Sequence, residues 1–300
     1  IGVTGVQTCA LPISLWLAIV TLQAALLAKL LACLQVERAV MLNNWLLPTN
    51  PTPELSGDEL AQLKHWLIAS YPNRALVMPT VNPTLEPELA TQLRRLGARL
   101  VPVRKVHLLD PRGVRYQRSS DVQRDRRLLK KTPYRIVDRK GGRRLNPDRL
   151  TELYHGLYIE KYGTSNAAFR RSYLEALLRS PAIEWVAYEH PQRGTIDMVT
   201  LWTTGARYLT KVMGAYDRTL PQKTGLYRMQ FLHPVVHIAE PAGLPINLSS
   251  GAALFKQLRG ATEALEYDAV WDDHLPAWRR LAWRLLEGKA RWNHRQQLRA

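Results

Sequence analysis

Cysteine is almost absent from this sequence of 300 residues, which has only two, Cys9 and Cys33. Two thiols cannot form the disulfide framework of a small secreted scaffold, and they are too few for a cysteine-ligated zinc cluster. Acidic residues are also scarce, with 25 against 42 lysines and arginines, so the formal net charge is +17. Such an excess favours an anionic partner: a nucleic acid, a phosphorylated small molecule or a membrane surface.

Several catalytic and nucleotide-binding signatures are missing as well. The sequence has no Gly-x-Ser-x-Gly elbow, no P-loop and no Gly-x-Gly-x-x-Gly fingerprint, which argues against hydrolase and dinucleotide-binding chemistry. His233 and His237 have the i, i+4 spacing of metal ligands, but no glutamate completes the zincin pattern. Their apolar neighbours favour packing, so we expect no metal site.

The longest apolar stretch, residues 14–34, is interrupted by Gln23 and Lys29. A membrane-spanning helix needs about 20 apolar residues, so we expect a buried or amphipathic helix, no integral membrane span and a cytoplasmic protein. Residues 3–13 look like a translated sequencing adapter, and the chain does not begin with Met. We therefore interpret residues 1–13 as a sequencing artefact that stands in place of the natural N-terminus.

The remaining sequence alternates strand and helix patterns, which predicts an α/β fold. Most of the excess positive charge lies in residues 101–150, and it is densest over residues 123–131. That run predicts a short helix with Leu128 and Leu129 turned inward. The basic, glycine-containing segment 140–147 is the best linker candidate, between a first half at 14–139 and a second half at 148–300.

The second half has the clearer order of elements, ααβββαβαβ followed by a terminal helix. Its predicted helices cover 148–162, 166–179, 226–239, 252–258 and 276–300, and its predicted strands cover 183–188, 195–202, 208–213, 246–248 and 265–271. In the first half, the patterns predict strands at 39–42, 75–78, 99–103 and 105–109, and helices at 56–70 and 86–96.

This order, together with the segments 214–217, 221–228 and 247–256, resembles the GNAT (N-acetyltransferase) fold in the branch related to Fem-type aminoacyltransferases. In that branch a Gly-x-x-x-aromatic-Lys segment opens the penultimate helix, as Gly251 to Lys256 does here. The resemblance covers about residues 148–285 and implies a GNAT acyltransferase lobe over 148–300. More weakly, it implies that 14–139 form a degenerate, truncated GNAT-like lobe, as in the Fem-type tandem arrangement.

The loop before the predicted helix at 226–239 is where the family holds coenzyme A, because free N–H groups and the helix dipole suit a pyrophosphate. Gln222 and Gly225 match the family's (Gln/Arg)-x-x-Gly-x-(Gly/Ala) pattern, whereas Tyr227 replaces its small last residue. The resemblance implies acetyl-CoA or another acyl-CoA as donor, bound by Gln222, Lys223, Thr224, Gly225 and Arg228. The mismatch at Tyr227 also fits an aminoacyl-tRNA donor or a purely structural loop.

Acyl transfer to an amine requires that the amine lose a proton and that an oxyanion be stabilised. The resemblance places the oxyanion donor at a backbone N–H near residues 211–214. Tyr216 and Asp217 follow as candidates for a base or a substrate anchor, although Asp217 suits a simple turn equally well. Lys256 is the sharper catalytic candidate, able to hold a carboxylate or phosphate; the alternative is an ordinary surface lysine.

Five further positions have two interpretations each. Tyr158 belongs to a helical stripe of tyrosines that suits either a core or an acceptor groove. Glu266 and Tyr267 alternate on a strand, so only one of them can face the site. His274 precedes the last helix as a base or a cap, and Arg228 opposes its helix dipole, which points to a bound anion or a salt bridge.

Together these features predict an N-acyltransferase that moves an acyl group from acyl-CoA to the amine of a small-molecule or peptide acceptor. An aminoacyl-tRNA-dependent transferase is the first alternative. A non-catalytic phosphate- or nucleic-acid-binding module on the same scaffold is the second.

Overall fold

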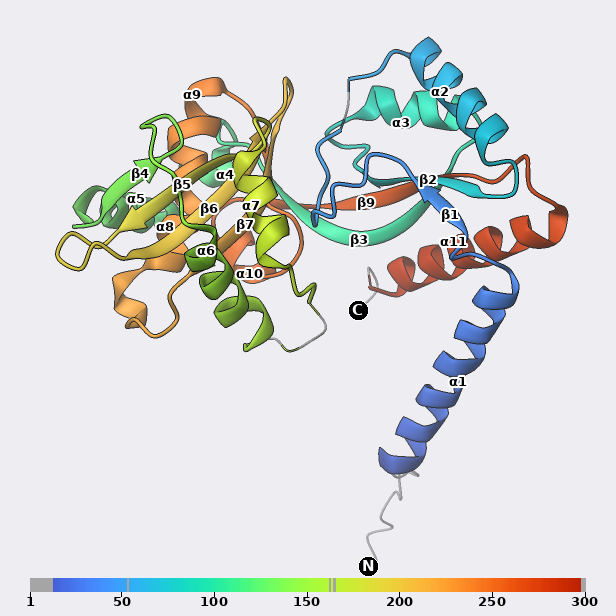
Figure 1. Ribbon diagram of the computed structural model, residues 1–300, viewed down its shortest axis with the longest axis horizontal. Coiled ribbons are helices and arrows are strands. Elements are labelled where there is room, and N and C mark those ends of the chain that lie inside the picture. Colours follow the sequence, from blue (N-terminus) through green and yellow to red (C-terminus); the bar gives the residue numbers. More distant parts are fainter. Residues whose placement is uncertain (1–12, 53, 162, 164–165, 298–300) are drawn as a thin grey trace, which may run out of the picture.

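A single nine-stranded sheet crosses the computed structural model, in the order β1-β2-β9-β3-β8-β7-β6-β5-β4 (Figure 1). The structure describes residues 13–52, 54–161, 163 and 166–297. Residues 1–12, which belong to the segment interpreted as a sequencing artefact, lie outside the described residues. The mixed sheet with helices on its faces confirms the α/β class expected from the sequence.

The strands are β1 (Ala39–Met41), β2 (Ala75–Val81), β3 (Arg99–Leu109), β4 (Arg135–Asp138), β5 (Glu184–Glu189), β6 (Ile196–Thr204), β7 (Leu209–Tyr216), β8 (Ile246–Asn247) and β9 (Thr262–Trp271). The helices are α1 (Ile13–Cys33), α2 (Gly57–Ser70), α3 (Pro87–Arg95), α4 (Val114–Gln117), α5 (Ser120–Lys131), α6 (Pro147–Tyr154), α7 (Arg171–Arg179), α8 (Leu226–Pro234), α9 (Glu240–Ala242), α10 (Ala253–Gln257) and α11 (Ala277–Gln297). Wider π-type turns extend α6 over His155–Ile159 and α8 over Val235–Ala239, and a 3₁₀ turn at Gln222–Thr224 precedes α8.

The predicted order of elements in the second half is confirmed: α6, α7, β5, β6, β7, α8, β8, α10 and β9 follow one another, and α11 ends the chain. The basic run also forms a helix, α5, with Leu129 buried and Leu128 packed against the same core. Three short elements were missed, α4, β4 and α9, because three or four residues are too few to show a period. The predicted strands at 99–103 and 105–109 are one strand with a register shift between Pro102 and Arg104.

The last strand, β9, lies between β2 and β3, two strands of the first half (Figure 1). It pairs antiparallel with β3 over most of its length and with β2 over its second half, from Tyr267 to Trp271. The end of β3 pairs in turn with β8, through Leu108 with Asn247 and Leu109 with Ile246. Strands from both sides of residues 140–147 therefore share one sheet, and the division into two lobes stays a prediction.

Helices cover both faces of the sheet. In the first half, Leu76 and Met78 of β2 pack in one cluster with residues of α2 and α3, while the alternate residues Ala75 and Val77 pack in another with residues of α11. In the second half, α5 and α8 cover one face and α6 and α7 cover the other. Buried side chains on alternate strand positions thus belong to different layers, as strand geometry requires.

The helix α1 projects away from the rest of the chain (Figure 1). Leu22, Leu26 and Leu30 are exposed along it, so these side chains are not buried as one reading of the sequence allowed. In the part of the chain that the structure describes, no helix has both the length and the apolar character needed to cross a membrane.

The start of α2 provides a test of local sequence control. The Ser56 hydroxyl accepts a hydrogen bond from the Glu59 N–H, and the Glu59 carboxylate accepts one from the Ser56 N–H, which is the predicted capping box. We expect Ser56→Ala to lower the free energy of unfolding by about 1 kcal/mol, because it leaves a helix N–H without its cap. Urea denaturation measures this loss. The control is Ser172→Ala, which changes an exposed serine of α7. An equal loss of stability in both variants would contradict the capping role of Ser56.

Candidate functional site

The strand β7 runs parallel to the two-residue strand β8 and pairs with it only at its own beginning, Leu209 with Ile246 and Thr210 with Asn247. Beyond these pairs, β7 continues to Tyr216, whereas the chain after β8 leaves the ladder and leads to α10. A cleft of about 1010 Å³ opens where the two strands separate. Its volume lies at the upper end of the ~300–1,000 Å³ typical of small-molecule pockets.

A β-bulge lies on the β7 wall of this cleft. Leu201 of β6 pairs with Met213, and the next residue, Trp202, pairs with Lys211, so Val212 is the extra residue. A bulge leaves one residue out of the ladder and often occurs next to active sites. It falls within residues 211–214, all of which line the cleft; the family resemblance implies an oxyanion donor in the same segment.

The cleft brings seven of the predicted site residues together: Tyr158, Tyr216, Asp217, Gln222, Gly225, Arg228 and Lys256. They come from the segment after α6, from β7 and the loop that follows it, from α8 and from α10. Five predicted residues are not among the described residues that line it: Lys223, Thr224, Glu266, Tyr267 and His274. The first half of the chain contributes Pro48 and Arg104 to the lining.

Lys256 is buried, with a relative exposure of 6%, so the interpretation as a surface lysine is wrong. Its Nζ donates hydrogen bonds to the backbone carbonyls of Leu248, Ser249 and Ser250 at 2.8–2.9 Å. Burial, together with the positive charges of Lys211 and Arg104, lowers its pKa to about 7. Three carbonyl oxygens favour the ammonium form, and they make Lys256 the group that holds the chain after β8 against α10.

Asp217 closes a turn, as one interpretation of the sequence proposed. Its Oδ1 accepts hydrogen bonds from the backbone N–H and hydroxyl of Thr219, and its Oδ2 lies 2.8 Å from Nη2 of Arg149. Although burial opposes them, these hydrogen bonds and the Arg149 charge lower the pKa of Asp217. Asp217 is therefore a carboxylate near neutral pH, better suited to anchoring a cation than to accepting a proton.

Arg228 has a protein anion of its own. Asp125 of α5, which is 1% exposed, lies 2.5 Å from Nε of Arg228 and 2.6 Å from Nε of Arg259. The guanidinium of Arg259 also lies 3.5 Å from the centre of the Phe255 ring. The salt-bridge interpretation of Arg228 is thus confirmed, and the buried carboxylate ties α5 to two cationic residues of the cleft wall.

Tyr227 occupies the position where the family pattern requires a small residue. Its ring centre lies 5.9 Å from that of Tyr216 and 4.7 Å from that of Phe255, so three aromatic rings connect β7, α8 and α10. Gly225, two residues earlier, begins α8 with φ +74°, and a Cβ there would lie 2.3 Å from Cδ2 of Leu128. Only glycine fits this close approach of α8 to α5.

Glu266 and Tyr267 point to opposite sides of β9, as the alternation predicted. Glu266 is 1% exposed and accepts hydrogen bonds from Arg104, Asn247 and Thr49, at 2.8–3.1 Å. It therefore supports the cleft residue Arg104 from behind, whereas Tyr267 packs against the core under α2 and α3.

His274 follows the opposite end of β9, where its Nε2 lies 2.8 Å from the carbonyl oxygen of Arg74. Of the two histidines on α8 and its π-type extension, His237 is exposed, whereas His233 is buried with its Nδ1 2.9 Å from the Tyr188 hydroxyl. Burial and the neighbouring His237 lower the pKa of His233 to about 3.

The cleft is strongly basic. Six of the residues that line it are cationic and one is acidic, Asp217; the cations are Arg104, Lys161, Lys211, Arg228, Lys256 and Arg259. Sequence reasoning did not name the side chains of several polar residues here as site residues, among them Arg104, Lys161, Lys211, Gln230 and Arg259. A single lysine inside the apolar β7 sequence was the available signal for Lys211.

Lys211 lies beside the bulge. Its Nζ is 3.5 Å from Oε1 of the buried Gln230, and burial lowers its pKa to about 8. Gln230 packs so closely on β7 that a Cβ on Gly214 would lie 2.3 Å from its amide nitrogen. A desolvated lysine next to a bulge and a cleft is a candidate for proton transfer.

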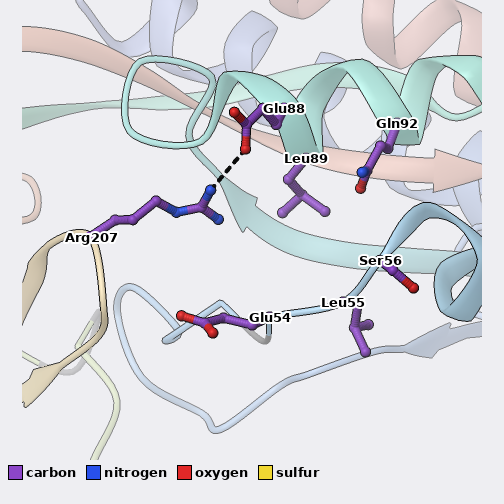
Figure 2. A pocket seen from close by; sticks show the side chains of 7 residues that line it. All are labelled: Glu54, Leu55, Ser56, Glu88, Leu89, Gln92 and Arg207. Atoms are coloured by element: carbon purple, nitrogen blue, oxygen red, sulfur yellow. Dashed lines mark hydrogen bonds and ion pairs between the residues drawn. The ribbon is translucent and has the colours of Figure 1, made fainter.

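A second, smaller hollow of about 360 Å³ lies at the start of α2 and α3. Figure 2 shows Glu54 and Leu55 on one side and α3, with Glu88 and Gln92, on the other. Arg207 of the β6–β7 turn reaches Glu88 at 3.1 Å, and both side chains are largely exposed. An exposed ion pair contributes little, and this hollow offers no comparable set of buried polar groups.

No known protein-family model matches the chain, and no curated protein matches it. Solved structures do. FemX matches with a TM-score of 0.54 and 11% sequence identity, over 76% of this chain and 80% of FemX. The C-terminal domain of a putative lysylphosphatidylglycerol synthetase from Agrobacterium fabrum matches with a TM-score of 0.53 and 14% identity, over 78% of each chain.

The chain has a GNAT-like fold. Likeness at these identities concerns the fold alone, and it confirms the resemblance drawn from the sequence at that level. A tandem GNAT protein from the clavulanic acid biosynthesis pathway also matches, at 17% identity and a TM-score of 0.40 over 76% of this chain and 73% of that one. The tandem arrangement predicted here remains a prediction.

The buried carboxylate of Asp125 generates a stability prediction. Removing one partner of a buried ion pair leaves the other charges unpaired, so Asp125→Ala should lower the free energy of unfolding by about 3–5 kcal/mol. The control is Asp121→Ala on the same helix, whose carboxylate pairs with the exposed Arg124 and should cost less than about 1 kcal/mol. Urea denaturation measures the free energy of unfolding of both variants. Similar losses in the two would show that the buried ion pairs of Asp125 do not stabilise the fold.

Proposed function

We propose that this chain is an N-acyltransferase that takes an acyl group from acyl-CoA and transfers it to an amine. The observation that carries the proposal is the cleft between the separated strands β7 and β8, which combines the bulge, the start of α8 and six cationic residues. At that end of α8, no side chain of the described residues forms a cap hydrogen bond. Free N–H groups and cations favour a phosphorylated donor.

In the proposed reaction, the neutral amine of Lys211 accepts the proton that the attacking acceptor amine loses. The nitrogen–carbon bond to the acyl group forms, and the carbon–sulfur bond to coenzyme A breaks as the thiolate leaves. A backbone N–H of the bulged segment 211–214 stabilises the oxyanion. Asp217 and Tyr216 anchor the acceptor, Gln222, Gly225 and Arg228 lie on the donor side, and Lys256 holds the wall between them.

The role of Lys211 has two measurable consequences. Its ammonium should titrate near pH 8 in an NMR titration of ¹³C-labelled lysines, well below the ~10.4 of a free lysine, because burial disfavours the charge. The neutral form, which accepts protons, therefore increases as the pH rises to 8. Loss of one resonance in Lys211→Met assigns the signal.

The same variant should slow acetyl transfer from acetyl-CoA to a screened panel of amines by about 10²–10⁴-fold, the usual contribution of a general base. Lys140→Met, at an exposed position outside the cleft, is the matched control. A Lys211 that titrates above pH 10, or a Lys211→Met that keeps the rate of the control, would contradict its role as the base.

Two observations favour aminoacyl-tRNA as a second candidate donor. Tyr227 fills the position that a small residue holds in the coenzyme A loop of the family, and it packs between Tyr216 and Phe255. The helix α5, which packs against α8, also carries the exposed cations Arg127, Lys130 and Lys131. A basic strip beside the cleft suits a long polyanion better than it suits a small cofactor.

Thermal-shift titrations with acetyl-CoA and with bulk tRNA separate the donors, because a ligand that binds the folded state raises the melting temperature. An acyl-CoA user should respond to acetyl-CoA, and replacing Arg127, Lys130 and Lys131 by glutamine should leave that response unchanged. A tRNA user should lose affinity steeply with salt, and the triple variant should flatten the salt slope by about 0.7–0.9 per lost phosphate contact. If neither ligand raises the melting temperature, the transferase proposal fails and a non-catalytic module is favoured.

A further inference from the structure

The last helix, α11, has apolar residues on two different sides. On one side, Ala282 is buried, and Trp283 and Ala290 pack against the cluster formed by Val77, Val101 and neighbouring residues of the sheet. This side holds α11 to the face of the sheet opposite α2 and α3, as Figure 1 also shows. It accounts for the attachment of the helix but not for its remaining large apolar side chains.

Those side chains form a second stripe that faces solvent. Trp278, Leu281, Leu285 and Trp292 are 48%, 49%, 52% and 61% exposed. Their spacing of three, four and seven residues puts them on one side of a helix with 3.6 residues per turn, away from Trp283 and Ala290. The two tryptophans are 14 positions apart along the chain, so the stripe is about 21 Å long at a rise of 1.5 Å per residue.

The border of this stripe, which we call the outer stripe, is cationic. Arg284 and Arg291 lie along one side of it and Lys289 along the other, and all three are exposed. The acidic residue of α11, Glu287, is turned toward the sheet and lies 3.7 Å from Arg99, with Arg291 also within 2.8 Å. The outer face of α11 is thus apolar along its centre and positive at its edges.

We propose that the outer stripe of α11 binds an anionic membrane surface, with the helix lying in the plane of the lipid headgroups. Apolar residues flanked by lysine and arginine are what such interfacial helices use: the apolar side chains enter the acyl boundary and the cations contact lipid phosphates. Tryptophan is enriched at this depth, and arginine keeps its charge at the surface while its stem is buried.

Other occupants fit the outer stripe less well. A second copy of the chain would bring the surface bordered by Arg284, Lys289 and Arg291 against an identical basic surface, and like charges repel. A nucleic acid would pair with the cations but would leave Leu281 and Leu285 without an apolar partner. An anionic bilayer satisfies both the charge and the apolar surface.

Co-sedimentation of the full chain with vesicles tests the proposal. The wild type should sediment with vesicles of mixed phosphatidylglycerol and phosphatidylcholine and should remain in solution with phosphatidylcholine alone. Changing Trp278, Leu281, Leu285 and Trp292 to serine should weaken binding by about tenfold or more, because apolar area no longer leaves water. Arg284→Gln with Lys289→Gln should weaken it by about fivefold for each charge removed.

Two matched controls distinguish binding through the outer stripe from non-specific binding of exposed tryptophans or cations to vesicles. Trp66→Ser changes a tryptophan that is also 61% exposed, but on α2 at the opposite face of the sheet, and it should bind vesicles as the wild type does. The glutamine variant of Arg127, Lys130 and Lys131 removes charge from α5 and should bind equally well. Thermal unfolding confirms that each variant folds; if the fourfold variant does not, Leu285→Ser alone replaces it.

Several results would overturn the proposal. One is a wild type that does not sediment with the phosphatidylglycerol vesicles, or an outer-stripe variant that binds them as tightly as the wild type does. Another is a dimer in analytical ultracentrifugation that dissociates in the outer-stripe variant, which would assign the surface to a second copy. The third is loss of bulk tRNA binding, without loss of vesicle binding, in the same variant. None of these outcomes depends on whether the chain transfers acyl groups.

Discussion

The separation of β7 from β8 is the constraint on which the candidate site depends. The two strands share only two residue pairs, and then one continues in the sheet while the other leaves it. Polar contacts fix the walls of the open side: Lys256 donates to three carbonyls after β8, and Glu266 pairs with Arg104 behind the cleft. A cleft made in this way exposes backbone groups that a continuous sheet would use in its ladder.

A cleft lined by six cations requires compensation, and the structure provides it in three forms. Asp125 neutralises part of the charge of Arg228 and Arg259, and Glu266 does the same for Arg104. Lys211 avoids much of the remaining repulsion by a lowered pKa. The result is a cleft whose positive charge is partly compensated within the protein and which still favours an anion.

Much of the fold was predictable from the sequence because its signals are local. The capping box at Ser56, the period of α5 and the order of elements after residue 146 depend on neighbours within a few residues. The loop that leads through Gln222 and Gly225 into α8 was predictable for the same reason. These features placed seven candidate residues around one cleft.

What could not be predicted depends on distant partners. Asp125 lies 103 residues from Arg228 and 134 from Arg259 along the chain, and no sequence period links them. The carbonyl contacts that bury Lys256 depend on the path of the chain after β8; the turn there is marked by Asn247 and Gly251, but neither residue indicates that its carbonyls meet Lys256. His274 was a candidate because it precedes the last helix, but the end of β9 that leads to it lies away from the cleft, as its pairing with β2 shows.

The position of β9 also determines when this chain can finish folding. Residues 262–271 separate β2 from β3, although they are made after nearly everything else. During synthesis, the edges of β2 and β3 that pair with β9 therefore lack their hydrogen-bond partner until the last strand leaves the ribosome and inserts between them. Contacts of such long sequence separation fold slowly, so the nascent chain is exposed to aggregation longest at these two strands.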